Sequence, residues 1–462
     1  MRAVARTMTR PAATTTTTTA AAAAAALIWL LSAGAVLAQA QLRAGPMLGY
    51  NTMREVAVWV QTVGPEEVRL RYWPVEAVRD IHYTASAKTS GEGAFCATLV
   101  ADSLREGTTY EYQVLLGGRA LPTPDPLRFT TQPLWAFRTD PPDYTLALGS
   151  CYYANEPAYD RPGKGYGGEY GIFRKIDSLR PDLMLWLGDN VYLRPGDFQS
   201  RGGVLHRHSH ARAIPELQPL LRRAHHYAIW DDHDYGPNDS DRSYVHKDWT
   251  REAHDLFWAN PPAALGEELA PGITTSFAYG DAQFFLLDNR TYRAPNACRT
   301  CDPMALLGDA QVDWLVDALV SSPATWKFVL VGGQVLSPAE VWENYAHHHG
   351  DERRRLLSRI SQEGVRNVVF LTGDRHHTEL SRTERGGVVM HDFTSSPLTS
   401  GATARNRDEG NTARVPGTFV GERNFGTITV SGAAGERSAT LRTYSAGGEK
   451  LWEYVIEAAG PK

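Results

Sequence analysis

The sequence of 462 residues lacks an excess of charge of either sign, since 47 Lys and Arg residues stand against 52 Asp and Glu residues. A formal net charge of -5 over this length excludes a strongly basic protein, and nothing in the composition suggests nucleic-acid binding. Beyond the N-terminus no run is apolar enough to cross a bilayer, so we expect no membrane span in the mature chain. Hydrophobic residues make up 42% of the sequence, which suffices for a sizeable core and for more than one domain.

Cysteine is also scarce, with four residues in the chain. Cys298 and Cys301 form a close pair, and no second such pair exists that could complete a structural zinc site. In an exported chain this pair favours a local disulfide over a redox motif. We expect Cys96 in a buried strand, whereas Cys151 directly follows an apolar run and is considered below.

The first 40 residues have the pattern of a signal peptide. Three arginines among the first ten residues precede an apolar run at residues 27–31, and Ala-Gln-Ala at residues 38–40 is similar to a cleavage site. An uncleaved membrane anchor is the alternative, but the apolar run is short for a span. We therefore predict that residues 1–40 are a cleaved signal peptide and that the mature protein is secreted or periplasmic.

Two domains are expected after this segment. Residues 44–133 alternate between apolar and polar positions, with Gly, Pro and Ser clusters between the runs, and they resemble a fibronectin type III-like β-sandwich. Beyond a Pro-rich linker at residues 132–142, strands alternate with helical patterns over residues 143–460. This predicts an α/β domain with a mixed sheet layered with helices. Residues 193–221 and 399–425 have the composition of loops, and the second could form a rim or lid over a site.

Four apolar runs in the second domain are followed at once by residue types that bind metals or transfer protons. They occupy residues 144–153, 183–197, 225–236 and 367–377. Taken singly, a Gly-Asp after a strand is more often a turn than a ligand, and a lone Cys is usually buried and inert. Together they predict one metal site at the carboxyl edge of the sheet, because crowded carboxylates repel one another unless a cation neutralises them.

The order of these clusters resembles the calcineurin-like metallophosphoesterase superfamily and, within it, the PhoD-like phosphatases. The resemblance extends over about residues 144–398 and rests on Gly-Ser-Cys at 149–151, Gly-Asp-Asn-Val-Tyr at 188–192, Asp-Asp-His-Asp at 231–234 and Gly-Asp-Arg-His-His at 373–377. A β-domain before the catalytic domain is also typical of this family. The resemblance implies a mixed β-sheet sandwich layered with helices.

The resemblance also implies a centre of two or more metal ions. Its metal ligands would be Cys151, Asp189, Tyr192, Asp232, Asp374 and His376. In that family Asp189 would bridge the ions, and the thiolate, phenolate and imidazole would complete an iron(III) site. Asp232 and Asp374 would bind the second ion. His233 would lie near the leaving-group oxygen as general acid, and Asn190 is a candidate donor to the substrate phosphate.

The second metal position departs from the wider superfamily. Where many relatives have Asn-His-Glu, this chain has Asp232-His233-Asp234, and where they have Gly-His-x-His it has Gly-Asp-Arg-His at residues 373–376. Each change replaces a nitrogen ligand by oxygen. Oxygen-rich sites suit calcium, magnesium or manganese better than zinc, and calcium is the ion that the resemblance implies.

These inferences predict a secreted, metal-dependent phosphatase similar to alkaline phosphatase D. It would hydrolyse phosphate monoesters, diesters or both by in-line attack of a metal-bound hydroxide. The substrate would be a small-molecule, lipid or cell-wall phosphate ester. The alternatives are a purple-acid-phosphatase-like enzyme or other phosphodiesterase of the same superfamily, and a non-catalytic cell-surface module.

Other conspicuous residues receive a plainer interpretation. The histidines at 206, 208 and 210 and those at 347–349 are expected to be exposed polar residues of loops. Asp288 and Arg290 could orient the site or simply pair with each other, and the sequence does not choose between these. Arg161 and Lys164 could meet an anionic substrate or only face solvent.

Overall fold

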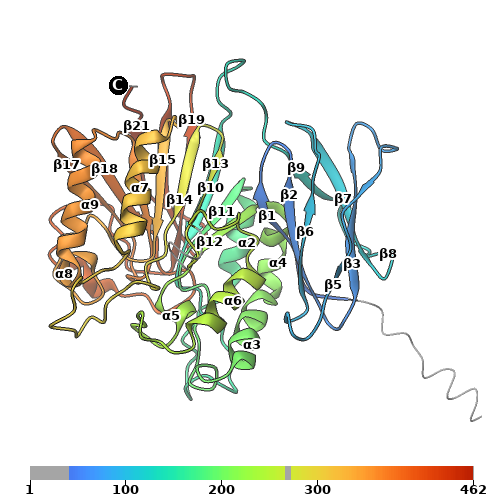
Figure 1. The fold of residues 1–462 in the computed structure, drawn as a ribbon, viewed down its shortest axis with the longest axis horizontal. Helices are drawn as coiled ribbons and strands as arrows, with labels where there is room; N and C mark the ends of the chain where they lie inside the picture. Colours follow the sequence, from blue (N-terminus) through green and yellow to red (C-terminus); the bar gives the residue numbers. More distant parts are fainter. Residues whose placement is uncertain (1–40, 266–271, 461–462) are drawn as a thin grey trace, which may run out of the picture. The chain divides into compact units, whose positions relative to one another are not determined.

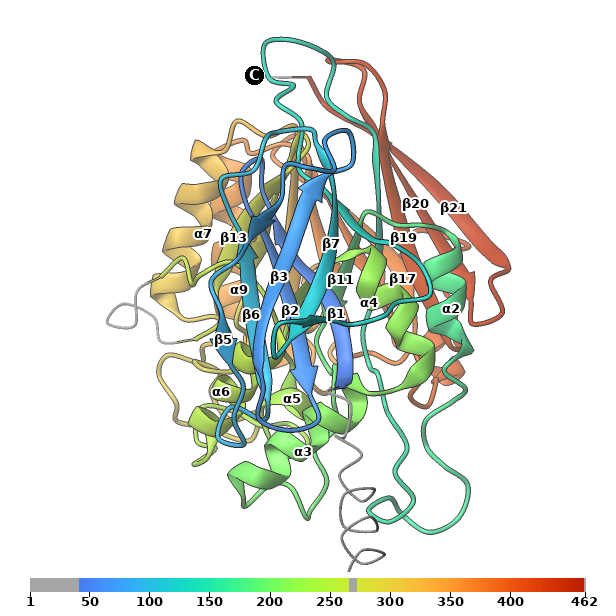
Figure 2. The same ribbon diagram turned by 90° about the vertical axis from the view of Figure 1, so that its right-hand side faces the viewer.

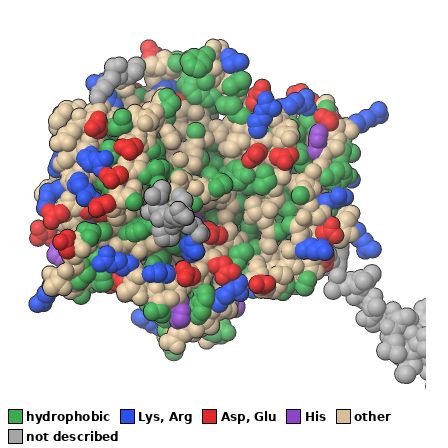
Figure 3. All heavy atoms as spheres, viewed as in Figure 1, with side chains coloured by type: hydrophobic (Ala, Val, Ile, Leu, Met, Phe, Trp, Pro, Cys, Tyr) green, Lys and Arg blue, Asp and Glu red, His purple; other side chains and the backbone are tan. Residues whose placement is uncertain are grey.

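The computed structural model describes residues 41–265 and 272–460. The predicted signal peptide lies outside these residues. Among the helices of the described ranges, none combines the length and the apolar character that a membrane span needs. On the face of the molecule in Figure 3, acidic and basic side chains are interspersed, in keeping with the small net charge.

The largest sheet has nine strands and contains the first three apolar runs singled out above (Figure 1). In order across the sheet they are β21 (Lys450–Glu457), β20 (Ser438–Ser445), β19 (Asn424–Ser431), β10 (Tyr144–Gly149), β11 (Leu183–Leu187), β12 (His225–Ile229), β1 (Leu42–Asn51), β2 (Val56–Thr62) and β6 (Cys96–Ala101). Strands β10, β11 and β12 are parallel, with Gly149 opposite Trp186 and Leu187 opposite Ile229. Their carboxyl ends therefore lie at one edge of the sheet.

A second sheet of six strands contains the fourth run. Its order is β13 (Thr275–Tyr279), β14 (Ala282–Leu286), β15 (Trp326–Val331), β16 (Val368–Thr372), β18 (Val388–Thr394) and β17 (Glu379–Arg385). Strands β15 and β16 are parallel, with Val331 opposite Thr372.

The two sheets pack face to face, and the alternation of β11 shows why. Leu183, Leu185 and Leu187 are buried in the core between the sheets, whereas Met184 and Trp186 belong to the core on the other face of the nine-stranded sheet. A strand with both faces covered must be apolar throughout, which explains the uninterrupted run in the sequence. The prediction of an α/β fold is confirmed.

Helices cover the outer face of each sheet (Figures 1 and 2). Those on the nine-stranded sheet are α2 (Gly171–Ser178), α3 (Arg201–Arg212), α4 (Gln218–Arg223) and α6 (Lys247–Phe257). Those on the six-stranded sheet are α7 (Asp309–Ser321) and α9 (Gly350–Gln362). The short helices are η1 (Pro215–Leu217), α5 (Asp232–Tyr235), α8 (Tyr345–His348) and η2 (Ala404–Asp408). The result is four layers in the order helix, sheet, sheet, helix.

The N-terminal segment is all β, as expected, but its strands are shared between two sheets. Strands β1, β2 and β6 extend the nine-stranded sheet, because Leu48 of β1 pairs in parallel with His225 of β12. The remaining strands form a third sheet: β4 (His82–Tyr83), β3 (Glu67–Pro74), β7 (Thr109–Leu116) and β8 (Arg119–Ala120), with β5 (Ala87–Lys88) on β3 and β9 (Leu127–Thr130) on β7. The nine-stranded sheet therefore contains strands from both sides of the linker at 132–142. The fibronectin type III-like fold of the N-terminal segment stays a prediction.

The expectation of a loop over residues 193–221 was wrong, since α3, η1 and α4 lie there. Ser200 caps α3 by accepting a hydrogen bond from the amide of Gly203 at 3.0 Å. The helix buries polar side chains along with aliphatic ones: Arg207 is fully buried and donates to Asp197 at 2.9 Å and to Glu156 at 2.7 Å. A helix with such a polar buried face has no apolar period that the sequence could display.

Candidate metal centre

The carboxyl ends of the four singled-out strands meet at one place, and glycines make the approach possible. A side chain at Gly373, after β16, would have its Cβ 2.5 Å from the carbonyl oxygen of Leu187 on β11. Gly188 has φ +90°, and a Cβ there would lie 2.7 Å from Cβ of Asp231. A glycine is thus required at 373, where the six-stranded sheet meets β11, and at 188, where the ends of β11 and β12 meet.

The residues that follow these strands have strained backbones. Cys151, Asp189, Asp374 and His376 all have a positive φ, at 58°, 52°, 64° and 54°. Such left-handed conformations cost non-glycine residues about 1 kcal/mol or more each and persist where surrounding structure enforces them. All four were predicted as metal ligands, and their strain marks the same place as a functional-site candidate.

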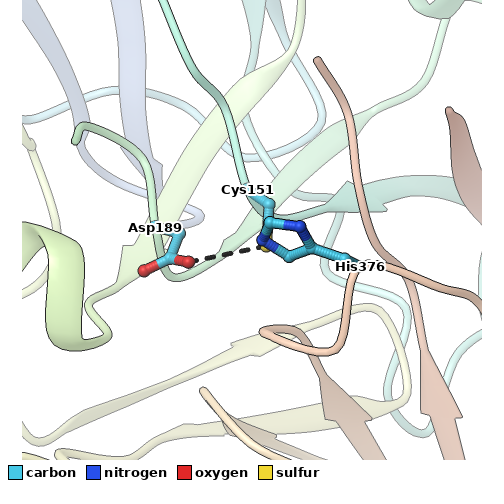
Figure 4. Close-up of side chains that lie close together, drawn as sticks. All are labelled: Cys151, Asp189 and His376. Carbon is cyan, nitrogen blue, oxygen red and sulfur yellow. Dashed lines mark hydrogen bonds between the residues drawn. The ribbon is translucent and has the colours of Figure 1, made fainter. Parts of the chain in front are cut away.

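The first group of candidate ligands joins the thiol of Cys151, the carboxyl of Asp189 and the imidazole of His376 (Figure 4), and the phenol of Tyr192 lies beside them. The Cys151 thiol donates to Oδ2 of Asp189 at 3.5 Å, and the Tyr192 hydroxyl donates to the same oxygen at 3.1 Å. Nε2 of His376 lies 3.3 Å from the Tyr192 hydroxyl. Nδ1 of His376 lies 2.6 Å from the carbonyl of Gly401, which accepts its proton and leaves the Nε2 lone pair facing the group.

Burial dominates the acid–base properties of this group. It raises the pKa of the Cys151 thiol to about 12. Burial, and next the charge of Asp232, raise the pKa of Asp189 well above its ordinary value, and burial together with Asp189 does the same to the pKa of Tyr192. Burial thus favours the protonated forms of these groups, whereas a cation among them would stabilise thiolate, phenolate and carboxylate.

The second group consists of Asp231, Asp232 and Asp374, whose candidate oxygens all lie within 4.8 Å of one another. One oxygen of each is buried without a hydrogen-bond partner: Oδ2 of Asp231, Oδ1 of Asp232 and Oδ2 of Asp374. Burial, and next the charge of Asp231, raise the pKa of Asp374 to about 8. Burial opposes ionisation of Asp232 as well, but the charges of His233 and Arg290 lower its pKa. Buried, unpaired carboxylate oxygens in close array are what a hard cation requires.

The two groups are linked. Asp189, Asp232 and His233 form a further set of candidate ligands within 4.8 Å, so Asp189 belongs to the thiol side and also to the carboxylate side. The ring of His233 packs on that of Tyr192 at 4.1 Å between centroids. Burial lowers the pKa of His233, and the charge of Asp232 opposes this shift. The donor sets fit the expectation of one ion on each side with Asp189 between them.

The predicted contact of Asn190 with substrate has no support in this geometry. Its side-chain nitrogen donates to the carbonyl of Ile229 at 2.7 Å, and its backbone amide donates to Oδ1 of Asp234 at 2.9 Å. Asp234 in turn accepts from the amide of Asp231 at 2.9 Å. Asn190 and Asp234 therefore tie two strand ends together.

Arg290 contacts carboxylates of the cluster, and its role in orienting the site stays a prediction. Its guanidinium is 1% exposed, bonds to Asp231, and lies 3.0 Å from Glu343 and 3.7 Å from Asp232. Asp288 accepts from the indole of Trp230 at 2.9 Å and from the backbone amide of Arg290 at 3.0 Å, so the side chains of Asp288 and Arg290 have different partners. The sequence analysis did not name Asp231 as a ligand, although it lies in the Asp-Asp-His-Asp motif. It also missed Glu343, which lies in a loop without a recognisable motif.

The prediction that the two histidine tracts are exposed loop residues was right in exposure for His347 and wrong for the other five histidines. His208 on α3 is buried, and His206 on the same helix lies 3.0 Å from Glu156. His349, after α8, is buried with Nδ1 3.2 Å from the carbonyl of Met304. None of them belongs to the ligand groups found among the described residues.

Two other expectations concern cysteines and loops. Cys298 and Cys301 form the predicted disulfide. Cys96 begins β6 and is half-buried rather than buried. Arg161 and Lys164 are exposed, and their contact with a substrate stays a prediction.

Residues 399–425 lie against the site, in agreement with the idea of a rim. The amide of Thr403 donates to the carbonyl of His376 at 2.8 Å, and Arg375 donates to both carboxylate oxygens of Glu409 at 2.8 Å. Together with the Gly401 carbonyl, these contacts fix the orientation of His376.

Fold and site together define an α/β protein of two packed sheets with a metal-ligand cluster on the strand ends. Residues 146–434 match the family model described as PhoD-like phosphatase, and residues 39–133 match a domain of unknown function, DUF7800. The first match covers more than half of the chain. This chain belongs to the PhoD-like phosphatase family, a family of phosphoric ester hydrolases.

Individual relatives agree with this placement. Alkaline phosphatase D of Bacillus subtilis (strain 168) is 25% identical over 394 residues, which cover 72% of this chain and 64% of that protein. The chain thus spans less than two thirds of that relative. A solved structure of PhoD shares the fold with a TM-score of 0.71 at 18% identity, over 90% of this chain and 92% of that chain. A fibronectin type III domain of human contactin 1 reaches a TM-score of only 0.16 over 21% of this chain at 18% identity, which decides nothing about the N-terminal segment.

Proposed function

We propose that this protein is a secreted or periplasmic, metal-dependent hydrolase of phosphate monoesters, diesters or both, similar in activity to alkaline phosphatase D. The observation that supports this most is the convergence of four strand ends on overlapping groups of ligand-type side chains with unpaired buried oxygens. The family model over residues 146–434 supports the same reaction class.

Two metal ions would be held by the residues that the resemblance named. Cys151, Tyr192 and His376 offer soft and phenolic donors suited to iron(III), and Asp232 and Asp374 offer oxygens suited to calcium, magnesium or manganese, with Asp189 between them. Asp231 adds a further oxygen on the second side. Bound ions would supply Lewis acidity toward phosphate oxygens and would acidify water.

His233 is the residue that we assign to proton transfer. Its side chain is 20% exposed, in contrast to the buried Asp189, and its imidazole is held against the ring of Tyr192. A partly exposed imidazole beside the cluster can give its proton to the oxygen of a departing alcohol. Burial, which lowers the pKa of His233, makes the imidazolium a stronger acid.

The test uses Asp189→Ala and His233→Ala, with Asp317→Ala on the exposed face of α7 as control. Metal content per chain and hydrolysis of a chromogenic phosphate monoester and diester are measured on the same samples. Asp189→Ala should lose bound metal and activity together. His233→Ala should retain its metal and turn over about 10²- to 10⁴-fold more slowly. Normal turnover by Asp189→Ala would refute the proposal.

A further inference from the structure

Two large aromatic side chains remain exposed next to the metal-ligand cluster. Tyr166 is 45% exposed and Trp342 is 53% exposed. The polar atom of each side chain contacts a fixed partner: a candidate metal ligand for Tyr166, and a residue bonded to a candidate ligand for Trp342. The Tyr166 hydroxyl lies 3.3 Å from Nδ1 of His376, and the Trp342 indole donates to Oδ2 of Asp239 at 2.7 Å.

Trp342 adjoins the carboxylate side of the cluster. The amide of Asp239, whose carboxylate accepts from the indole, donates to Oδ2 of Asp232 at 2.7 Å. The backbone carbonyl of Trp342 accepts from Arg375 at 3.1 Å, and Arg375 lies 3.9 Å from Asp374. Trp342 is therefore linked through Asp239 to Asp232 and through Arg375 to Asp374.

Tyr166 adjoins the thiol and phenol side. Its ring packs edge-on against Tyr153 at 4.9 Å between centroids and lies 6.3 Å from the rings of both Tyr192 and His376. The loop that carries Tyr166 is fixed to the rim by Arg423, which donates to the Tyr166 carbonyl at 3.2 Å. The phenol ring is thus held in place rather than merely projecting into solvent.

The metal-ligand cluster is partly open to solvent. Cys151 and Asp189 are buried, but the side chains of Asp374 and His233 are 18% and 20% exposed. The Trp342 indole also packs edge-on against His348 at 4.8 Å between centroids, and both it and the Tyr166 ring keep about half of their surface exposed. Exposed aromatic surface is unfavourable, and rings restrained in this way beside a partly exposed site are suited to bind a flat group.

We propose that Tyr166 and Trp342 form an aromatic subsite that binds the organic group of the phosphate ester and favours esters that carry an aromatic ring. This inference rests on the proposed function, because the phosphate would lie at the metal-ligand cluster. Arg375, which donates to the carbonyl of Trp342, is engaged with Glu409, so the recognition that we assign to this subsite comes from the rings. Stacked or edge-to-face ring pairs favour a flat aromatic group over a saturated one of the same size.

The experiment measures calorimetric binding of benzylphosphonate, cyclohexylmethylphosphonate and methylphosphonate to the metal-loaded protein. These probes cannot be hydrolysed, so binding is tested independently of turnover. We expect benzylphosphonate to bind more tightly than the other two. Trp342→Ala and Tyr166→Ala should each weaken benzylphosphonate binding about 2- to 10-fold and leave methylphosphonate binding unchanged. Tyr166→Phe, which keeps the ring, should retain most of the preference.

Tyr159→Ala is the matched control, because Tyr159 lies in the same loop and is 52% exposed but packs on His206 of α3. It should bind all three probes as the parent does. Equal binding of benzyl- and cyclohexylmethylphosphonate, or equal losses for all three probes in Trp342→Ala and Tyr166→Ala, would overturn the aromatic subsite. Failure of the parent to hydrolyse benzyl and methyl phosphate would count against the proposed function alone, since the binding comparison does not depend on it.

Discussion

Arg290 offers the sharpest test of how charge is arranged beneath the metal-ligand cluster. Its guanidinium is buried among carboxylates, where it bonds to Asp231, lies 3.0 Å from Glu343 and donates to the carbonyl of Ser240 at 3.1 Å. The perturbation is Arg290→Gln in metal-free protein. Glu343 keeps Arg293 at 2.9 Å as a partner, but Asp231 keeps only the neutral amide of Asn289 at 2.8 Å.

The expected loss of stability follows from the unpaired charge on Asp231. Removing one member of a buried ion pair costs about 3–5 kcal/mol. The loss has a ceiling, because Asp231 can take up a proton instead. At pH 8 that protonation costs about 5–6 kcal/mol, from about 1.4 kcal/mol for each pH unit above the ordinary pKa of an aspartate. The expected loss of about 3–5 kcal/mol lies below this ceiling.

The assay is urea unfolding of the parent, Arg290→Gln and Arg293→Gln in the presence of a chelator at pH 8 and pH 5. Arg293 is the matched control because it is as buried as Arg290 and its ion pair is with Glu343 rather than with Asp231. In Arg290→Gln the folded pKa of Asp231 is raised, so stability should fall as pH rises above its unfolded pKa. Part of the loss should therefore be recovered at pH 5.

Two outcomes would contradict this explanation. One is a free energy of unfolding for Arg290→Gln within about 1 kcal/mol of the parent at pH 8, because a buried unpaired carboxylate should destabilise the fold by more than that. The other is the same recovery at pH 5 in Arg293→Gln, which would mean that the recovery does not come from Asp231.

Three further predictions follow from the site and its surroundings. Cys151→Ser should weaken iron binding and shift the visible absorption of iron-loaded protein, as checked by spectroscopy and metal analysis; an unchanged spectrum would exclude the thiolate as a ligand. Chelation of the parent should lower its melting temperature, because bound ions stabilise the folded state alone; an unchanged temperature would count against a metal centre. Glu379 is buried, yet the hydrogen bond and charge of His377 and the charge of Arg414 lower its pKa to about 2. Its stabilisation is complete above the unfolded pKa and is lost as pH falls from about 4.5 to about 2, so Glu379→Gln should show a shallower acid loss in urea unfolding.

The location of the site could be predicted from the sequence because it depends on strand ends. Leu183 to Leu187 is apolar throughout, so it had to be a strand with both faces covered, and Asp189 had to follow at its carboxyl edge. The same argument applied to Cys151, Asp232 and Asp374. Because parallel strands end at the same edge of a sheet, this location could be predicted without knowing the order of the strands.

Features that depend on distant partners could not be predicted. Arg207 is buried because Glu156 lies 51 positions away in the sequence and next to it in space, and no local pattern reveals that pairing. The contact of Arg290 with Glu343 is of the same kind. Strand β1 joins the large sheet because it pairs with β12, and the paired residues 48 and 225 are far apart in the sequence. Each of these depends on tertiary contacts that override local composition.

The strain and the charge of the site lead to one further argument. Four residues with left-handed backbones and a set of buried, partly unpaired carboxyl groups all raise the free energy of the metal-free fold. Both costs fall on Cys151, Asp189, Asp374 and His376, or on their immediate neighbours, and not on the cores between the layers. A cation at the cluster would offset the charge cost directly and would hold the strained turns through its ligands. Metal binding should therefore stabilise the strand ends most, and hydrogen exchange of the amides of residues 188–192 and 373–377 should slow more on metal addition than exchange in β20 and β21.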